Sequence, residues 1–146
     1  MFVGGMFTTF DIAASGLRAE RARMNVVANN MANVNTTHNR YGDIEAYRRQ
    51  RVFFKPGAPE VTGSARWGVS VEAVKPDYDT QLVHKWDPEH PDAVQEGEWK
   101  GYVAYPNIHA AMEMVDMMVA ARAYEANLTS MESAKQVHRS ALQIIA

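Results

Sequence analysis

The segment Asp87-Pro-Glu-His-Pro-Asp92 gathers side chains that could bind a metal ion. Its two aspartates, one glutamate and one histidine offer the oxygen and nitrogen ligands that a metal-dependent hydrolase uses. Its two prolines, however, favour a rigid turn in which the acidic side chains point in divergent directions. We expect a structural turn that holds no metal, and a metal hydrolase is the competing hypothesis.

A second group, Tyr47-Arg-Arg-Gln-Arg51, places three arginines beside Phe53 and Phe54. Basic and aromatic residues together are typical of nucleic-acid binding. The whole chain, however, has a formal net charge of -2, and phosphate binding usually requires a basic surface. We expect no nucleic acid as a partner, and we interpret the group as an exposed strand that forms ion pairs with a neighbouring acidic surface.

No other pattern in the chain is typical of a catalytic site. The sequence has no cysteine, no glycine-rich phosphate loop and no serine nucleophile elbow. No two of its five histidines have the i, i+4 spacing that, together with a glutamate, marks a helical zinc site. We therefore expect no enzyme, no cofactor and no small-molecule substrate.

The sequence also lacks the pattern of a membrane-spanning segment or a secretory signal peptide. No stretch reaches the roughly 18 consecutive apolar residues that a spanning helix requires. The first ten residues contain no lysine or arginine, and Asp11 follows them. We expect a protein that does not span a membrane and that leaves the cytoplasm, if it does so, by another export route.

The composition divides the chain into three segments. All six prolines lie between Pro56 and Pro106, and ten of the fourteen aromatic residues lie between Tyr41 and Tyr105. Methionine and alanine are concentrated toward the two ends, as helices favour. We expect an α+β protein with helical arms at 1–36 and 107–146 and a small β-rich middle domain at 37–106, in which residues 68–74 alternate like a strand.

Apolar residues in both arms follow the spacing of amphipathic helices. The first arm predicts a helix from about Thr8 to Val34, and the second runs without glycine or proline from Asn107, a possible N-cap, to Ala146. The second arm carries two apolar stripes, and one helix of this chain can cover only one of them. We therefore expect packing against helices of other molecules. The residues expected in these helix seams are Phe10, Leu17, Met24, Met31, Val115, Val119, Tyr124, Leu128, Met131 and Leu142.

An asparagine-rich run, Asn29-Asn-Met-Ala-Asn-Val-Asn35, ends the first arm. Asparagine is a mediocre helix former, so one interpretation is a fraying helix end that enters a loop. The other is a ladder of buried amides that fixes the register against another helix, as polar core residues do in coiled coils.

Several motifs resemble those of the bacterial flagellar axial proteins, which build the rod, hook and hook-filament junction. The N-terminal signature is similar to Phe10-Asp-Ile-Ala-Ala-Ser-Gly-Leu17 followed by Asn29-Asn-Met-Ala-Asn-Val-Asn-Thr-Thr37, and the C-terminal signature to Arg122-Ala-Tyr-Glu-Ala-Asn127. Within that family, the segments at 86–93, 101–108 and 113–117 resemble the proximal rod proteins. The resemblance covers nearly the whole chain and is weakest at about 38–85.

This resemblance implies an antiparallel coiled coil of the two terminal helices, lining the axis of a tubular assembly, with the β-rich segment further out. It implies a structural subunit of the proximal rod, part of the drive shaft that passes torque from the rotor to the distal rod and hook. Its partners would be other copies of itself, other rod proteins and, in transit, the flagellar type III export apparatus. Assembly would take place in the periplasm, without cleavage of a signal peptide. The register would be set by Asn29, Asn30, Asn33, Asn35 and Asn127.

A soluble coiled-coil adaptor with a β insertion, acting outside flagella, is the alternative. It predicts a stable dimer or a defined complex with a helical partner, and no polymer.

Overall fold

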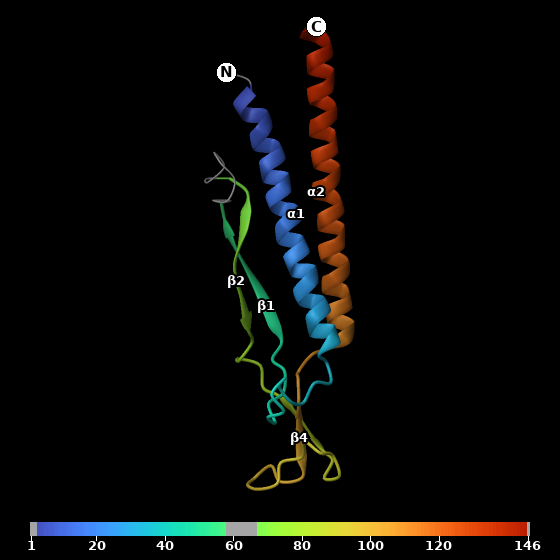
Figure 1. Ribbon diagram of the computed structural model, residues 1–146. Helices are drawn as coiled ribbons and strands as arrows, with labels where there is room; N and C mark the ends of the chain where they lie inside the picture. Colours follow the sequence, from blue (N-terminus) through green and yellow to red (C-terminus); the bar gives the residue numbers. More distant parts are fainter. Residues whose placement is uncertain (1–2, 58–66, 146) are drawn as a thin grey trace.

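The protein consists of two long antiparallel helices and two short β-ribbons (Figure 1). The computed structural model describes residues 3–57 and 67–145, with side chains at 9–57 and 67–144. The elements are α1 (Val3–Ala32), β1 (Gln50–Pro56), β2 (Val69–Pro76), β3 (Val83–Trp86), β4 (Tyr102–Tyr105) and α2 (Ala110–Ile145). The predicted α+β architecture of paired terminal helices around a β-rich middle is confirmed.

Both helices are long for a chain of this size. At 1.5 Å per residue, the 30 residues of α1 span about 45 Å and the 36 residues of α2 about 54 Å. The end of α1 is closed by Asn33, whose side-chain amide donates to the Asn29 carbonyl at 2.8 Å and accepts from the Thr36 hydroxyl at 3.1 Å. α2 starts at Ala110, three residues after the predicted cap at Asn107, and the His109 carbonyl accepts the first hydrogen bonds, from the Met112 and Glu113 amides.

Two contacts define the register between α1 and α2. Gly16 lies against the Asn127 side chain, and Asn30 donates a hydrogen bond to Glu113. The two pairs are separated by 14 residues on each helix and run in opposite directions, so the helices keep one antiparallel register over two heptads. The buried and half-buried positions of α2 include a row at alternating spacings of four and three: 113, 117, 120, 124, 127, 131, 134, 138 and 141.

Small residues allow the elements to pack closely. Ala13, Ala19 and Ala120 are buried, at 6%, 3% and 0% exposed, and Gly16 has no side chain at its contact with α2. An alanine at an interface leaves room for the facing backbone, whereas a larger side chain would push it away. Small residues therefore occupy buried positions on both helices, and Gly16 provides a close contact between them.

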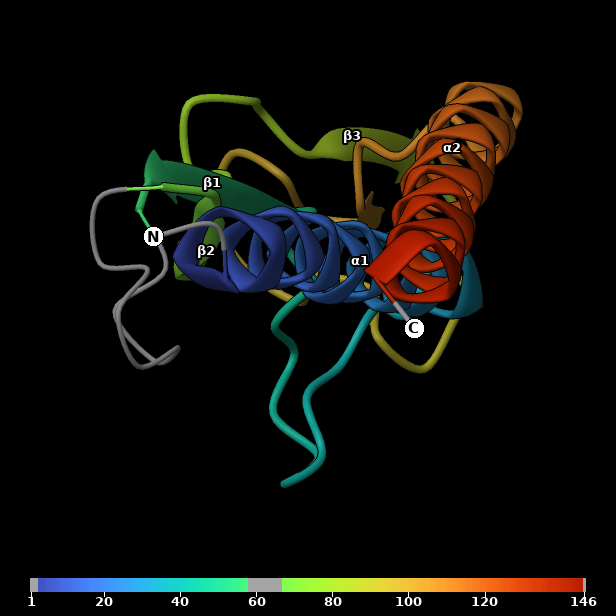
Figure 2. The same cartoon turned by 90° about the horizontal axis from the view of Figure 1, so that it is seen from above.

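The β1–β2 ribbon packs along α1, and α2 packs on a different side of the same helix (Figures 1 and 2). The Ser15 hydroxyl joins the ribbon to α1, because it accepts a hydrogen bond from the Val69 amide at 3.1 Å and donates to the Ile12 carbonyl at 2.7 Å. The pairing of the two strands shifts between Phe53 and Phe54. A two-stranded ribbon is marginal alone, so α1 supplies the surface that stabilises it.

The β3–β4 ribbon lies beyond the ends of the two helices (Figure 1). Its Val103 is fully buried, whereas Trp86 is 63% exposed. The Trp86 ring lies over Gly101, where an added Cβ would come within 2.6 Å of it, and the φ of +80° at Gly101 also favours glycine. The ribbon therefore has a small core of its own around Val103 and an exposed aromatic side chain, Trp86.

The contact between Gly16 and Asn127 predicts that the effect of Gly16→Ala on stability changes sign when Asn127 is also replaced. A Cβ at Gly16 would lie 2.8 Å from Asn127 Nδ2, so Gly16→Ala should lower the free energy of unfolding by about 1 kcal/mol, the net of overpacking over helix propensity. With Asn127→Ala present, the clash is absent, and Gly16→Ala should raise stability by up to about 1 kcal/mol. Thermal unfolding followed by circular dichroism measures both effects. An equal effect in the two backgrounds would contradict the proposed contact.

Candidate functional site

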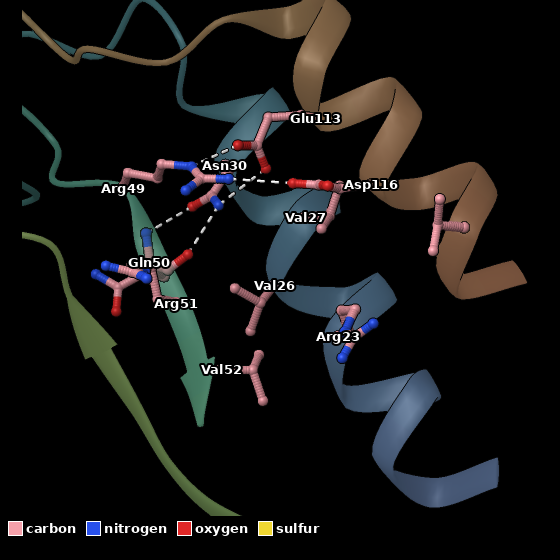
Figure 3. A pocket seen from close by; sticks show the side chains of 11 residues that line it. Arg23, Val26, Val27, Asn30, Arg49, Gln50, Arg51, Val52, Glu113 and Asp116 are labelled. Atoms are coloured by element: carbon pink, nitrogen blue, oxygen red, sulfur yellow. Dashed lines mark hydrogen bonds and ion pairs between the residues drawn. The ribbon is translucent and has the colours of Figure 1, made fainter. Parts of the chain in front are cut away.

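Asn30 connects three elements through one buried amide (Figure 3). Its side chain is on α1, and the residue is 1% exposed. The amide nitrogen donates to the Gln50 carbonyl at 3.0 Å and to Glu113 Oε2 at 3.1 Å. The amide oxygen accepts from the Gln50 amide at 2.8 Å and from the Tyr47 hydroxyl at 3.2 Å. All four hydrogen-bonding positions of the amide are therefore used, and two of them pair with Gln50 as a neighbouring strand would.

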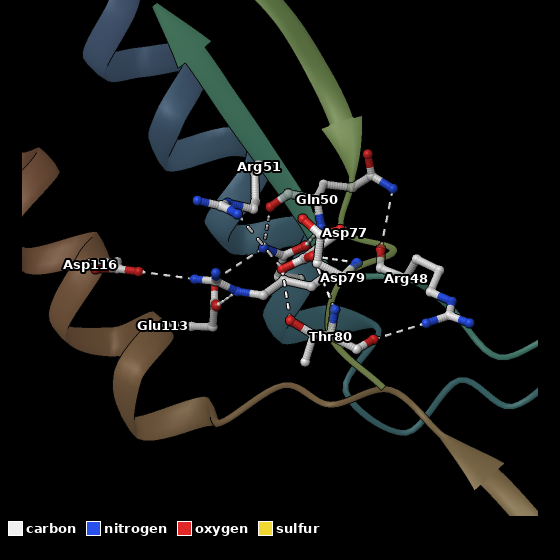
Figure 4. A network of polar contacts seen from close by, with 10 residues as sticks. Arg48, Gln50, Arg51, Asp77, Asp79, Thr80, Glu113 and Asp116 are labelled. Atoms are coloured by element: carbon white, nitrogen blue, oxygen red, sulfur yellow. Dashed lines mark hydrogen bonds and ion pairs between the residues drawn. The ribbon is translucent and has the colours of Figure 1, made fainter. Parts of the chain in front are cut away.

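Glu113 provides the α2 side of this junction (Figure 4). The residue is 1% exposed, and a buried carboxylate is tolerated only when it is paired. Arg49 supplies that pair, with Nε 2.6 Å from Glu113 Oε1 and Nη2 3.2 Å from Asp116 Oδ2. Burial, together with the nearby Glu113 charge, raises the pKa of the Tyr47 phenol, so the hydroxyl remains a hydrogen-bond donor to Asn30.

The other asparagines predicted to set the register lie in different surroundings. Asn29 and Asn35 are exposed, Asn33 closes the end of α1, and Asn127 lies against Gly16. The structure therefore contains one fully buried amide at this end of α1 and no ladder among the described asparagines of the run. The end of α1 does not fray into a loop, because the hydrogen bonds of Asn33 close it.

The residues predicted for the helix seams divide into two groups. Phe10, Leu17, Met24 and Met31 of α1 recur every seven residues and are half-buried, as are Tyr124 and Met131 of α2. Four more are largely exposed, so in this chain they lie outside the interior of the α1–α2 pair: Val115 at 49%, Val119 at 53%, Leu128 at 40% and Leu142 at 54%. For these four a role between chains remains a prediction.

Hydrophobic spacing alone missed the polar and small members of the seam. Glu113 and Asn127 occupy inward positions of α2, and Ala120 between them is fully buried. A search for apolar stripes passes over a glutamate and an asparagine. A search for small or amide residues repeated every seven positions would have found Ala120, Asn127, Ala134 and Ala141, but not Glu113.

The first turns of α2 expose a dense apolar surface. Exposed fractions are 64% for Met112, 53% for Met114, 49% for Val115, 55% for Met118 and 53% for Val119. Large apolar patches on a protein surface commonly mark interaction sites. We call these five residues the α2 apolar patch.

In the acidic segment 87–92, the carboxylate of the last residue, Asp92, is held by local hydrogen bonds. Asp92 Oδ2 accepts hydrogen bonds from the Thr37 hydroxyl and from His38 Nδ1, which joins the turn to the segment after α1. The hydrogen bond from Thr37, and then that from His38, holds the pKa of Asp92 below its usual value. Among the described residues, no group of three histidines or acids is arranged to hold a metal ion.

The arginines of 47–51 form ion pairs and hydrogen bonds within the chain. Arg49 contacts Glu113 and Asp116, Arg48 donates to the Thr80 carbonyl at 3.0 Å, and Arg51 lies 4.0 Å from Asp77 (Figure 4). The acidic surface expected to neutralise this group is thus supplied partly by α2. Over residues 3–57 and 67–145, neither helix is long and apolar enough to cross a membrane.

Comparison with known proteins gives a consistent set of similarities. Residues 10–38 match the family described as flagella basal body rod protein, and residues 100–144 match the C-terminal family of flagellar basal body rod FlgEFG proteins. The chain is 41% identical to the flagellar basal-body rod protein FlgC of Borreliella burgdorferi, over 97% of this chain and 98% of the relative. Identity is 36% to FlgC of Bacillus subtilis, covering 94% and 97%, and 35% to FlgC of Escherichia coli O6:H1, covering 90% and 92%.

Replacing Asn30 should destabilise the fold far more than replacing its neighbour. Asn30→Leu removes the hydrogen bonds that Asn30 makes to the Gln50 backbone, the Tyr47 hydroxyl and Glu113 Oε2 in a buried junction, and should lower the free energy of unfolding by about 2–4 kcal/mol. Asn29→Leu is the matched control, because Asn29 is exposed and the change should stay within about 0.5 kcal/mol. Urea unfolding measures both, and similar losses would contradict the role of Asn30.

The network at Asp92 predicts a stability that is lost in acid. Because the pKa of Asp92 is lowered in the folded state, its ionised carboxylate stabilises the fold at any pH above the unfolded-state pKa of about 3.9. This contribution is lost as the pH falls through the lower pKa of the folded state. Thr37→Val should raise the pKa of Asp92, as seen by NMR titration of the carboxyl carbon. Thr36→Val is the control, since Thr36 bonds Asn33 instead. An unchanged pKa in Thr37→Val would show that the hydroxyl does not hold the carboxylate.

Proposed function

The chain belongs to the FlgC family of flagellar basal-body rod proteins, and from this membership we propose that it is a subunit of the proximal rod that transmits torque. A structural role in the rod follows from the family itself. The similarity extends along at least 90% of this chain and of each relative compared, which is the observation that carries the assignment. It decides for the rod over a coiled-coil adaptor outside flagella.

The α1–α2 pair is suited to carry load. Torsional stiffness requires many apolar contacts that together resist deformation and polar contacts that prevent sliding by one turn. The half-buried row on α1 provides the first, and the Asn30–Glu113–Arg49 junction and the Gly16–Asn127 contact provide the second. We infer that Asn30 and Asn127 set the register of the helices in the assembled rod. Asn29, Asn33 and Asn35, near the end of α1, are the other proposed register residues.

The α2 apolar patch is proposed as a contact between subunits. Val115 and Val119 are about half exposed, whereas the α1 face of α2 is already covered. Leu128 and Leu142 extend this proposed contact along α2. In this proposal the arms 1–36 and 107–146 build the assembly and the middle domain 37–106 lies further from its axis.

The remaining parts of the proposal concern partners and place. Other copies of this chain and other rod proteins are the proposed neighbours, in the periplasmic part of the basal body. Passage through the flagellar type III export apparatus, without a cleaved signal peptide, is the proposed route. No catalytic role is proposed, because Asp92 and the arginines of 47–51 are engaged in contacts within the chain.

A complementation experiment tests the role and the proposed contact together. A strain that lacks this protein should keep its membrane-embedded rotor ring and lack rods and hooks. The wild-type gene should restore them, whereas Val115→Asp should not, because assembly would bury an unpaired charge. Thr129→Asp, two heptads along the same helix face and also exposed, is the matched control and should restore them.

Electron microscopy of basal bodies and motility assays provide the readout. Urea unfolding of purified Val115→Asp should match wild type within about 0.5 kcal/mol, which separates assembly from folding. Rods in the deletion strain would overturn the proposed role. Normal rods with Val115→Asp would overturn only the contact.

A further inference from the structure

A groove of about 230 Å³ lies between α2 and β1, with α1 as its floor (Figure 3). Valines supply its apolar lining: Val26, Val27, Val52 and Val119. Its size is below the roughly 300–1,000 Å³ typical of pockets for small molecules and cofactors. The groove therefore suits one or two side chains of another protein.

The charged rim of this groove is positive. Its lining includes three arginines and two acids, and Arg49 contacts both acids, Glu113 and Asp116. Arg51 is half-exposed and only 4.0 Å from its partner Asp77, while Arg23 lies 3.5 Å from Glu20 and over the Phe54 ring. A partner segment with a partial negative charge would be favoured at this rim.

The opposite end of the molecule presents a segment with the complementary properties. Val3 is 13 residues before Gly16, and Ser140 is 13 residues after Asn127, so in the observed register the last turn of α2 extends past the start of α1 (Figure 1). That end exposes Val137 at 66%, Leu142 at 54% and Ile144 at 85%. Val137 and Ile144 are seven residues apart and therefore share one face.

The backbone of this helix end adds a charge complement. The last carbonyls of an α-helix have no partners within the helix and carry the negative end of its dipole. The last turn of α2 contains no basic residue that could bind these carbonyls. Arginine side chains from elsewhere would stabilise them, and aliphatic side chains of the same turn would fit an apolar groove.

We propose that the groove between α2, β1 and α1 receives the last turn of the C-terminal helix of an adjacent rod subunit, one that ends in aliphatic residues as α2 does. This inference rests on the proposed function and names the partner segment. Because groove and helix end lie at opposite ends of the helical pair, the contact is heterologous and joins subunits head to tail. The Asn30–Glu113–Arg49 junction, whose residues also line the groove, would place the entering turn relative to all three elements.

Photo-crosslinking in assembled basal bodies tests the inference. The photoreactive residue p-benzoylphenylalanine at position 119, on the groove wall, should crosslink to the last turn of a rod subunit's C-terminal helix, identified by mass spectrometry. Position 118 is the matched control, because Met118 is similarly exposed on α2 and is not among the lining residues. Crosslinks from 119 to another segment, or the same product from both positions, would overturn the proposal while leaving the rod role intact.

A binding measurement covers the case in which the modified chain does not assemble. A peptide of residues 130–145 has the required helix end, and it should bind the full-length protein saturably. Ile144→Asp in the peptide should weaken binding at least tenfold, and Val119→Asp in the protein should do the same, because its carboxylate would face the negative end of the helix dipole. Failure of the wild-type peptide to bind folded protein, or equal binding by all variants, would overturn the proposal.

Discussion

The amide of Asn30 is the contact on which the arrangement of the elements depends. It is buried, all of its hydrogen-bonding positions are used, and its partners belong to α2, to the start of β1 and to the chain just before β1. A buried amide with unsatisfied positions is costly, so this geometry excludes positions of α2 shifted by a turn. Glu113 adds a second constraint, because its buried charge requires Arg49 at the same place.

The remaining contacts follow from that arrangement. With the register set at Asn30 and Glu113, Gly16 meets Asn127 two heptads away, where only glycine leaves space for the amide. The β1–β2 ribbon is then placed along α1, where Ser15 bonds Val69. α1 is therefore covered on two sides, whereas α2 has one covered face and keeps an apolar patch that the described residues leave exposed.

These properties suit a subunit of a rod. A solitary globular protein would gain little from helices of about 45 and 54 Å with an exposed apolar patch. In an assembly the same features supply contact area along the axis, while polar junctions inside each subunit resist sliding. Stiffness within a subunit and association between subunits thus use different side chains of the same two helices.

The sequence by itself was sufficient for the helical arms, the β-rich middle and the family. These depend on local spacing, on the distribution of proline and aromatic residues and on motifs such as Asn29–Thr37, all of which can be read along the chain. Asn30 was also among the predicted register residues, although its neighbours in the run were not distinguished from it. Spacing along one helix cannot show which amide a distant strand will reach.

Only the tertiary structure decided which residues contact one another within the chain. Hydrophobic pattern missed Glu113 as an inward residue, because a buried carboxylate is stable only once Arg49, 64 residues away in the sequence, is beside it. The alternation at 68–74 predicts a regular strand, whereas the strand pairing shifts between Phe53 and Phe54, Glu72 has no partner on β1, and Val71 is 37% exposed. Both outcomes depend on groups that only folding brings together, and local sequence carries no signal for them.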